Sequence, residues 1–539
     1  MPGIISLGTR AMFAAQAQLN TTAANISNAN TPGYSRQTVE LETAGGQFTG
    51  AGFFGKGVNI TTVSRAHDAF LSREVTLSQA LAAHDAARLE QLQRVERVFD
   101  LGENGLGARV SAFLNAFVDV ASDPNDPSAR QVVLSRAQAL TSQVRSVAAQ
   151  LDSIQTGVTE DIKTSVDAAN QLVQRIADLN QQIARVKGFG HEPNDLLDQR
   201  EQLINELNHY IGVTQIPASD GTVGLFIGGG QKLLLGSNAL ELRALPDTYD
   251  SSRVVLGVHE GGVDRRLDDR VLGGGSIAGL LRFQREDLPV AINEVGRLAG
   301  VIAARVNAQH AAGTTPPPVA PGPPIFATGA PRALPASTNT GTAAVGVVIQ
   351  DATLLSAKDL ELTFRSGAWQ VRELPDGSFT ALSAAQLLSD HGLQLSFSGT
   401  AQEGDRFLLE PSRLVAASMD VILNDPMRLA ATSATESNGN AKAMLALRDE
   451  RMVRGMTLAD AYAGVTASVG VRVMGAEAAS EMSSSIAKDA EVRRNNVEGV
   501  NLDEEAARLI QFQQAYQAAA KVLQVAQSVF DTLLQTAAR

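Results

Sequence analysis

The stretch LIQFQQAYQAAAKVLQVAQSVFDTLL, residues 509–534, repeats its apolar side chains in alternating steps of three and four. Two such steps make one heptad, the spacing that places side chains on one face of an α-helix. The stretch therefore predicts an amphipathic C-terminal helix. Its apolar seam consists of Leu509, Phe512, Tyr516, Ala519, Leu523, Ala526, Phe530 and Leu533.

The N-terminus carries a weaker seam of the same kind. The turn signature Thr31-Pro32-Gly33 predicts where this first helix ends. Charged side chains are scarce at both ends of the chain, with none in residues 11–35. A solvated coiled coil normally carries Glu and Lys beside its seam, so the scarcity favours helices that touch neighbours on most sides. The N-terminal seam consists of Ile5, Gly8, Met12, Ala15, Leu19, Thr22 and Ile26.

Two interpretations of these ends are open. Both helices dock on their own domain, as most seams at helical spacing do, or they pair with each other and with copies in adjacent subunits. Fixing the backbone opposes folding by about 1 to 2 kcal/mol per residue, and a seam with several Ala, Thr or Gly members buries little apolar surface. We therefore expect both ends to be frayed or disordered in a monomer.

Composition excludes several classes of protein. The chain has 539 residues, which at roughly 100 to 200 residues per domain predicts three or four domains. Its formal charge of −12, without a local basic stripe, argues against nucleic acid as a partner. The absence of cysteine excludes disulfides and thiolate sites. No apolar run reaches the roughly 20 residues of a membrane span, so we expect neither a membrane partner nor a cleaved signal.

Two periodicities divide the interior of the chain. A heptad seam over residues 129–187, with a stutter near Gly157, predicts one very long helix or two stacked ones. Strand alternation appears in residues 213–284 and again around 360–397. Gly228-Gly229-Gly230 is the best hairpin candidate. Further helical patterns cover residues 67–99, 106–120, 194–210, 288–307 and 458–500.

These patterns predict a multi-domain α+β fold. The N- and C-terminal helices pair in a coiled-coil-like inner domain, which is joined to a long helical bundle domain and to strand-rich outer insertion domains. The expected units are a terminal helix plus strand hairpin (1–64), the first part of the helical bundle (65–212), a strand-rich outer domain with a closing helix (213–311), a Pro-rich linker or loop (312–344), a second strand-rich outer domain (345–424), the return part of the bundle (425–500) and the C-terminal helix (501–539).

Reactive chemistry is not indicated anywhere in the sequence. The spacing Gly50-Ala51-Gly52-Phe53-Phe54-Gly55 resembles a dinucleotide-binding loop, but the following residues alternate as a strand where that fold needs a helix. A hairpin explains it better. The seven histidines show no metal-ligand spacing. We predict no catalytic residue, no cofactor and no metal, and therefore no enzyme.

Both ends resemble the axial proteins of the bacterial flagellum. The N-terminal match includes Asn25-Ile26, Asn28 and Thr31-Pro32-Gly33-Tyr34-Ser35-Arg36-Gln37. The C-terminal match covers Asn501–Glu505, Leu509–Lys521 and Phe530–Leu534. The residues Tyr34 to Gln37 and the amino-acid sequence of the last helix are most similar to the hook-associated protein 1 family, the hook-filament junction proteins. Residues 126–131 and 194–200 also resemble this family.

The resemblance implies a structural protein that forms a ring of identical subunits between hook and filament through its terminal helices. The implied partners are copies of itself, the hook protein, the next hook-filament junction protein, and an export chaperone that holds the C-terminal helix. The implied location is the extracellular flagellum, reached by type III export. Alternatives are another axial protein of hook or rod type, or a secreted protein with an enzymatic or adhesive middle insertion.

Overall fold

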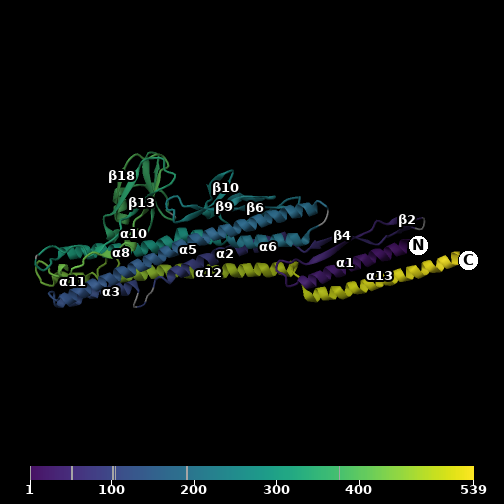
Figure 1. Ribbon diagram of the computed structural model, residues 1–539, viewed down its shortest axis with the longest axis horizontal. Helices are drawn as coiled ribbons and strands as arrows, with labels where there is room; N and C mark the ends of the chain where they lie inside the picture. Colours follow the sequence, from purple (N-terminus) through teal and green to yellow (C-terminus); the bar gives the residue numbers. More distant parts are fainter. Residues whose placement is uncertain are drawn as a thin grey trace.

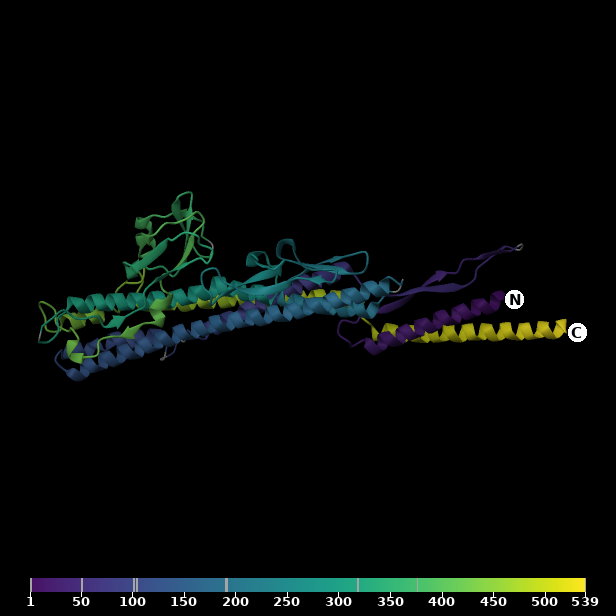
Figure 2. The same cartoon turned by 45° about the horizontal axis from the view of Figure 1, so that its top comes forward.

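The computed structural model describes residues 2–49, 52–99, 102, 105–189, 192–317, 319–375 and 377–538. The molecule is a long rod (Figure 1). A bundle of long helices forms one part of the rod, the two terminal helices extend from one end of the bundle, and two strand-rich regions lie along one side (Figures 1 and 2). The predicted multi-domain α+β fold is confirmed.

Within the described residues, the longest helices of the bundle are α2, α5, α6, α8 and α12, and shorter helices pack among them. The chain runs out along α2, back along α5, out again along α6 and α8, and returns along α12, which lies beside α2 (Figure 1). The bounds of the bundle helices are α2 (Ala69–Glu96), α3 (Leu106–Asn115), α4 (Phe117–Ser122), α5 (Pro127–Lys187), α6 (Asn194–Tyr210), α7 (Ser276–Arg282), α8 (Leu288–Ala312), α11 (Gly439–Ala446) and α12 (Leu458–Glu498).

The seam of residues 129–187 forms one unbroken helix, α5, and not two stacked ones. Asp126 caps its N-terminus by accepting a hydrogen bond from the Ser128 amide, and Pro127 occupies the first helical position. At the stutter, buried Gln155 takes a seam position and donates to the Gln284 side chain at 3.1 Å. The polar pair lets the seam pass through the change of register. Val133, Leu140, Val144, Val158 and Ile162 are fully buried along it.

The first strand-rich region holds two antiparallel sheets. The predicted glycine hairpin is confirmed, because β6 and β7 pair on either side of Gly228–Gly230, where Gly229 has φ 69°. One sheet has the order β5-β6-β7-β8, and the other has the order β11-β10-β9. The bounds are β5 (Thr214–Pro217), β6 (Val223–Ile227), β7 (Gln231–Leu235), β8 (Asn238–Ala239), β9 (Glu241–Pro246), β10 (Val254–Glu260) and β11 (Val263–Arg266).

The second strand-rich region is a five-stranded sheet of order β13-β19-β15-β16-β17, accompanied by the pair β14-β18 and helix α9. A turn at Ser366-Gly367 joins β15 to β16 with φ values of 52° and 75°, as a tight hairpin requires. The bounds are β13 (Arg332–Pro335), β14 (Ala344–Ile349), β15 (Leu360–Arg365), β16 (Ala368–Glu373), β17 (Thr380–Ala381), α9 (Ala384–His391), β18 (Leu393–Ser398) and β19 (Arg406–Glu410).

Two expected unit boundaries differ from the structure. The segment 312–344, expected as a linker or loop, contains β12 (Phe326–Ala327), which pairs with β20 (Asp420–Val421), and also contains β13 of the five-stranded sheet. Phe326 is buried against the ring of Phe113, with ring centroids 5.4 Å apart, so apolar packing fixes a segment that its prolines suggested was free. The closing helix of 213–311 packs into the bundle, because α7 contacts α2 and α8 contacts α5.

The terminal module consists of α1 (Pro2–Asn28), α13 (Leu502–Ala537) and a strand arm between α1 and α2. The arm comprises β1 (Gln37–Thr43), β2 (Gln47–Thr49), β3 (Gly52–Phe54) and β4 (Val58–Arg65), with β1 paired to β4 and β2 paired to β3. Helix α1 ends before Thr31-Pro32-Gly33, as predicted. Asn501 caps α13 by accepting from the Asp503 and Glu504 amides, and the acidic first turn suits the positive end of the helix.

Candidate functional site

Helices α1 and α13 lie side by side and run in opposite directions (Figures 1 and 2). A Cβ at Gly8 would lie 3.0 Å from the Leu523 side chain, and at the other end Asn25 hydrogen-bonds Glu505 at 2.9 Å. Small residues at the crossing let the two backbones approach closely. Ala14, Ala15, Ala519 and Ala526 are all at most 7% exposed.

The predicted C-terminal seam is divided by this pairing. Ala519 and Ala526 are buried, whereas the outer members Phe530 and Leu533 are 43% and 44% exposed. The half-buried members are Leu509, Phe512, Tyr516 and Leu523. Helix α1 therefore covers the middle of the seam and leaves its far end open.

The predicted N-terminal seam shows the same division. Ala15 and Thr22 are buried, and Ile5, near the start of α1, is 38% exposed. The half-buried members are Met12, Leu19 and Ile26. The exposed ends of the two seams meet, because α1 and α13 are antiparallel. Together they border a groove of about 460 Å³ lined by Ile4, Ile5, Ala518, Lys521, Val522, Val525, Ala526, Val529 and Phe530.

A polar joint connects this helix pair to the bundle, and its centre is Asn25. The Asn25 side chain donates to the Gln37 carbonyl and to Glu505 Oε2, and it accepts from the Gln37 amide and from the Tyr34 hydroxyl, each at 2.9 Å. One buried amide thus ties α1, the motif loop and α13 together. Burial, with the nearby carboxylates Asp195, Asp198 and Glu505, raises the pKa of Tyr34 to about 12, so its hydroxyl remains a donor.

The motif loop, residues 28–37, reaches the bundle through α6. The Ser35 amide and hydroxyl donate to the two oxygens of Asp198, at 3.0 and 2.8 Å, and Gln37 Nε2 donates to Asp195 at 3.2 Å. Gly33, with φ 78°, faces Gln202 so closely that a Cβ would lie 3.3 Å from it. Two of the stretches that carry the family resemblance, 28–37 and 194–200, therefore meet in space.

The first half of the motif loop is held by local bonds. Asn28 Nδ2 donates to the Ala24 carbonyl at 3.0 Å, and the Thr31 hydroxyl donates to Asn28 Oδ1 at 3.3 Å. The Tyr34 amide donates to the Thr31 carbonyl at 3.2 Å across Pro32, closing the turn. At its far end the Arg36 amide donates to the Glu498 carbonyl at 2.8 Å, and the Arg36 guanidinium pairs with Glu504. The loop therefore contacts the ends of both C-terminal helices, α12 and α13.

Arg65, the last residue of the arm, anchors the joint electrostatically. Its Nη1 donates to Asp198 Oδ1 and to Glu201 Oε2, each at 2.8 Å. Burial raises the pKa of Asp198 in spite of its hydrogen bonds from Ser35 and Arg65. Burial alone would also raise the pKa of Glu201, but the charges of Arg65 and His67 outweigh it and the pKa is lowered. Both carboxylates accept charge-assisted bonds from one guanidinium, which makes the contact directional.

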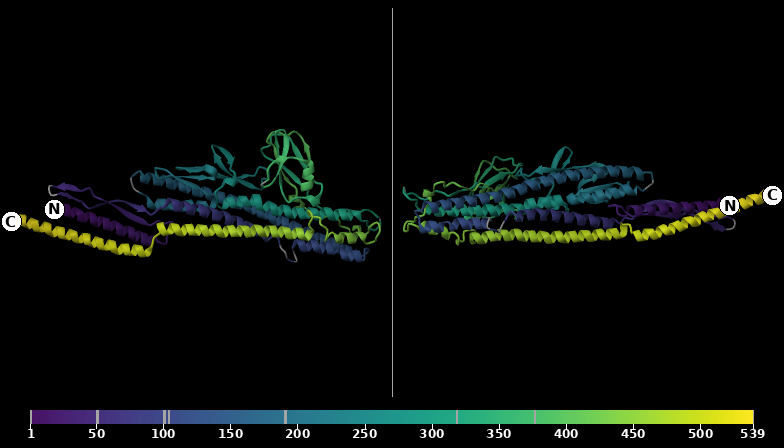
Figure 3. Two further views of the ribbon diagram at one scale, coloured as in Figure 1. Left: turned by 180° about the vertical axis from the view of Figure 1, so that it is seen from behind. Right: turned by 60° about the horizontal axis from the view of Figure 1, so that its bottom comes forward.

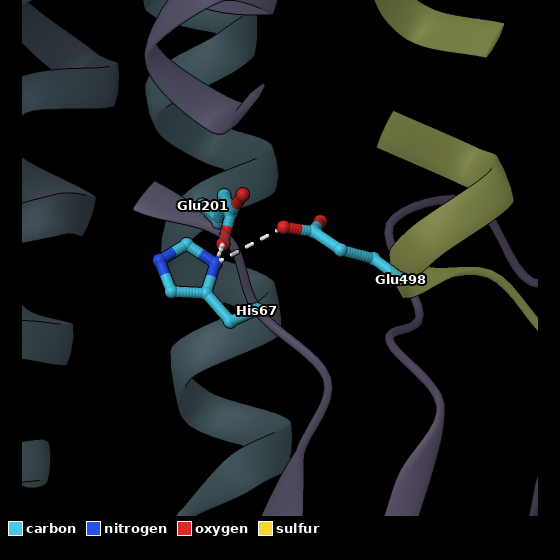
Figure 4. Close-up of side chains that lie close together, drawn as sticks. All are labelled: His67, Glu201 and Glu498. Carbon is cyan, nitrogen blue, oxygen red and sulfur yellow. Dashed lines mark ion pairs between the residues drawn. The ribbon is translucent and has the colours of Figure 1, made fainter. Parts of the chain in front are cut away.

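His67 lies between Glu201 of α6 and Glu498 of α12 (Figure 4). Its Nδ1 is 3.6 Å from Glu201 Oε2 and 3.4 Å from Glu498 Oε1, a spacing that could suit a metal ion. The carboxylates are already engaged, because Glu201 accepts from Arg65 and Ser72, and Glu498 accepts from the Asp68 amide. We interpret the three side chains as part of the joint that fastens α2, α6 and α12.

Sequence reasoning missed the joint almost entirely. Arg65, Glu201 and Glu498 carried no signal, because their partners lie more than 100 residues away in the chain. Asn25 and Glu505 lie inside the quoted motifs, and their polar side chains in charge-poor helices are the signal that could have marked them.

Within the described residues, no helix combines the length and apolarity needed to cross a membrane.

Family models match most of this architecture. Residues 92–326 match the flagellar hook-associated protein FlgK helical domain, and residues 334–411 match the flagellar hook-associated protein 1, D2-like domain. The ends match more general models, the flagella basal body rod protein over residues 5–34 and the flagellar basal body rod FlgEFG protein C-terminal over residues 495–536.

Full-length relatives give the same result. The flagellar hook-associated protein 1 of Escherichia coli (strain K12) is 32% identical over 545 residues, which cover 99% of this chain and 100% of that protein. The protein of the same name from Bacillus subtilis (strain 168) is 25% identical, over 97% of this chain and 96% of its own. The solved flagellar hook junction protein FlgK from Burkholderia pseudomallei, 21% identical, superposes with a TM-score of 0.74 over 79% of this chain and 100% of that chain.

Proposed function

Because this chain belongs to the flagellar hook-associated protein 1 family and is a structural component of the flagellar junction, we propose that its copies form a ring there through α1 and α13. The ring joins hook to filament. In it, the terminal helices pack against those of neighbouring subunits, and the strand-rich regions face outwards. The alternative of a hook or rod protein is disfavoured, because the full-length relatives are hook-associated protein 1.

The solvent exposure of α13 supports this proposal most strongly. Among its 36 residues, only Glu505, Ala519 and Ala526 are buried. Large apolar side chains on its other faces are exposed, including Ile510 at 56%, Val525 at 56% and Leu534 at 53%. The few charges on this helix cannot keep such a surface well hydrated, so its cover must come from other molecules.

The same surface indicates the other partners that we propose. The hook protein and the next junction protein would contact the ring at its two ends. Before export, a chaperone would hold α13, because an unpaired apolar helix is an aggregation hazard in the cell. Export would place the chain at the hook-filament junction outside the cell.

We propose the unit boundaries expected from the sequence, except that the second strand-rich unit begins near Arg332 and not at 345.

Loss of the gene tests the function directly. Electron microscopy of the deletion strain should show hooks without filaments, and expression of the full chain should restore the filaments. Normal filaments in the deletion strain would contradict the proposal. Labelled antibody against the chain should bind only at the point where hook meets filament.

We further propose that the chain has no enzymatic activity. Of the described side chains, Ser356, His391 and Glu373 come nearest to a catalytic array, with Ser356 Oγ 2.8 Å from His391 Nδ1 and His391 Nε2 3.6 Å from Glu373. Ser356 is only 8% exposed, and Glu373 is paired to Lys358. A fluorophosphonate probe should leave Ser356 unlabelled in the folded chain. Labelling that disappears in Ser356→Ala would contradict this proposal.

A further inference from the structure

The strand arm ends in an unusual aromatic tip. Phe48, Phe53 and Phe54 are 79%, 72% and 56% exposed. Phe48 and Phe53 are directly opposite each other across β2 and β3, so the two rings share one face of the hairpin. The ring of Phe53 lies over Gly46, where a Cβ would come within 2.2 Å of it. The tip therefore presents an apolar surface to its surroundings.

The stem of the arm is fastened to its own α1. Asn59 accepts a hydrogen bond from Arg10 of α1, and a Cβ on Gly57 would lie 3.2 Å from Leu7 of α1. Within the arm, the Ala44 amide donates to the Gly57 carbonyl at 2.8 Å. These contacts aim the arm along α1 towards the free end of the rod. In Figures 1 and 3 the tip lies at the same end as both chain termini.

The apolar groove between α1 and α13 lies at this same end. Its lining residues Ile4, Val525 and Val529 are 51%, 56% and 40% exposed, so no described part of the chain fills it. The exposure of the three Phe rings means that the arm does not fold back into its own groove. A projecting apolar tip and an open apolar groove thus lie at one level along the rod.

We propose that the aromatic tip of one copy docks in the α1–α13 groove of the adjacent copy in the ring. This inference rests on the proposed function. The contact joins two different surfaces, so it is heterologous, and repeated around a rotation axis it closes into a ring. Because tip and groove lie at the same end of the rod, copies standing side by side at the same height would present one to the other.

The contact is too small to assemble a ring by itself. A whole aromatic side chain buries about 150 to 250 Å², and these three rings are 79%, 72% and 56% exposed, so docking would bury roughly 300 to 500 Å² of them, below the roughly 800 Å² per partner of a stable interface. The docked tip alone would not hold two copies together in solution. It would orient neighbouring subunits relative to each other once their terminal helices pack together at the end of the hook.

Crosslinking tests the proposal against a clean background, because the chain has no cysteine. Flagella from cells that express the double variant Phe48→Cys with Val525→Cys should give a ladder of crosslinked multimers with a short bismaleimide. Cells that co-express the two single variants should give dimers, which proves that the bond joins different copies. The matched control Phe48→Cys with Val471→Cys, whose second site is 70% exposed on α12, should give no ladder.

A second variant covers the case in which cysteines disturb assembly. Phe48→Ser with Phe53→Ser should leave the melting temperature of the purified chain unchanged, because both rings are exposed, and should reduce filament-bearing cells at least tenfold. Wild-type filament numbers, or a crosslink confined within one chain, would overturn the docked tip. If antibody still finds the chain at the junction in those cells, the proposed function stands and only this inference fails.

Discussion

Helices α5 and α13 have the same heptad pattern, but their apolar seams are buried to different extents within the chain. Of the 61 residues of α5, 23 are buried, whereas α13 buries three of 36. The α5 seam packs against α6, α8 and the strands of its own chain, whereas α1 is the main neighbour of the α13 seam. A seam therefore reports that a helix will be covered, and the rest of the chain decides whether the cover is internal.

The largest effect is expected where the cover is internal. Val158→Asp places an unpaired carboxylate at a position of α5 with no exposed surface, and it should reduce the free energy of unfolding of the bundle by about 4 kcal/mol or more. Urea unfolding followed by circular dichroism measures this change. Ser153→Asp, on the exposed side of the same helix, is the matched control and should change stability by less than about 0.5 kcal/mol. Equal effects would mean that the seam is not the core of the bundle.

Acid should weaken the bundle through His310 of α8. Burial lowers its pKa from the ordinary 6.5 to about 4, and its two ring nitrogens are bonded to the Pro323 carbonyl and the Ala430 amide. Between these pKa values the unfolded chain binds a proton that the folded chain does not, so stability falls as pH falls from about 6.5 to about 4. The loss is on the order of 3 kcal/mol.

Unfolding of wild type and His310→Gln across this pH range measures the effect. Other groups titrate in both chains, so the difference between their pH profiles isolates the histidine. Profiles of the same slope would show that His310 does not control this dependence.

The joint between the two regions should respond more moderately. Asn25→Ala leaves the Tyr34 hydroxyl, the Gln37 amide and the Glu505 carboxylate without their shared partner, a loss of about 1 to 3 kcal/mol in local stability. Hydrogen exchange of residues 25–40 measures this change. Asn28→Ala removes the bond to the Ala24 carbonyl of its own helix and the 3.3 Å bond from the Thr31 hydroxyl, both local, and should have a much smaller effect. Matching exchange rates in the two variants would remove Asn25 from the centre of the joint.

The smallest effect on the isolated chain is expected at Leu523, although its effect on assembly is total. Leu523→Asp changes a half-buried position on α13, so the melting temperature of the bundle should stay within about 2 °C of wild type. Ring formation and filament attachment should be lost, because a charge would enter the packed seam. Gln394→Asp introduces the same charge at an exposed position of β18, and cells that carry this variant should swim normally. Motile Leu523→Asp cells would break the comparison between the two regions.

The sequence predicted helices better than it predicted their partners. The pattern over 194–210 gave the bounds of α6 to the residue, because helical spacing is a local property. Residues 106–120 form two helices, α3 and α4, where one pattern was expected, since seam spacing does not mark the break near Ala116. The joint could not be predicted, because Ser35 and Asp198 are 163 residues apart and no periodicity records such a pair. Burial of Phe326 likewise depends on a distant ring.

Hydrogen exchange on α13, compared between the purified monomer and intact flagella, tests the central claim most directly. If its cover comes from neighbouring copies, the amides of residues 506–538 should exchange in the monomer at least about 1,000-fold faster than those of the α5 seam. In flagella the same amides should become as slow as those of α5. Slow exchange across α13 in the solitary chain, equal to that of α5, would contradict the account.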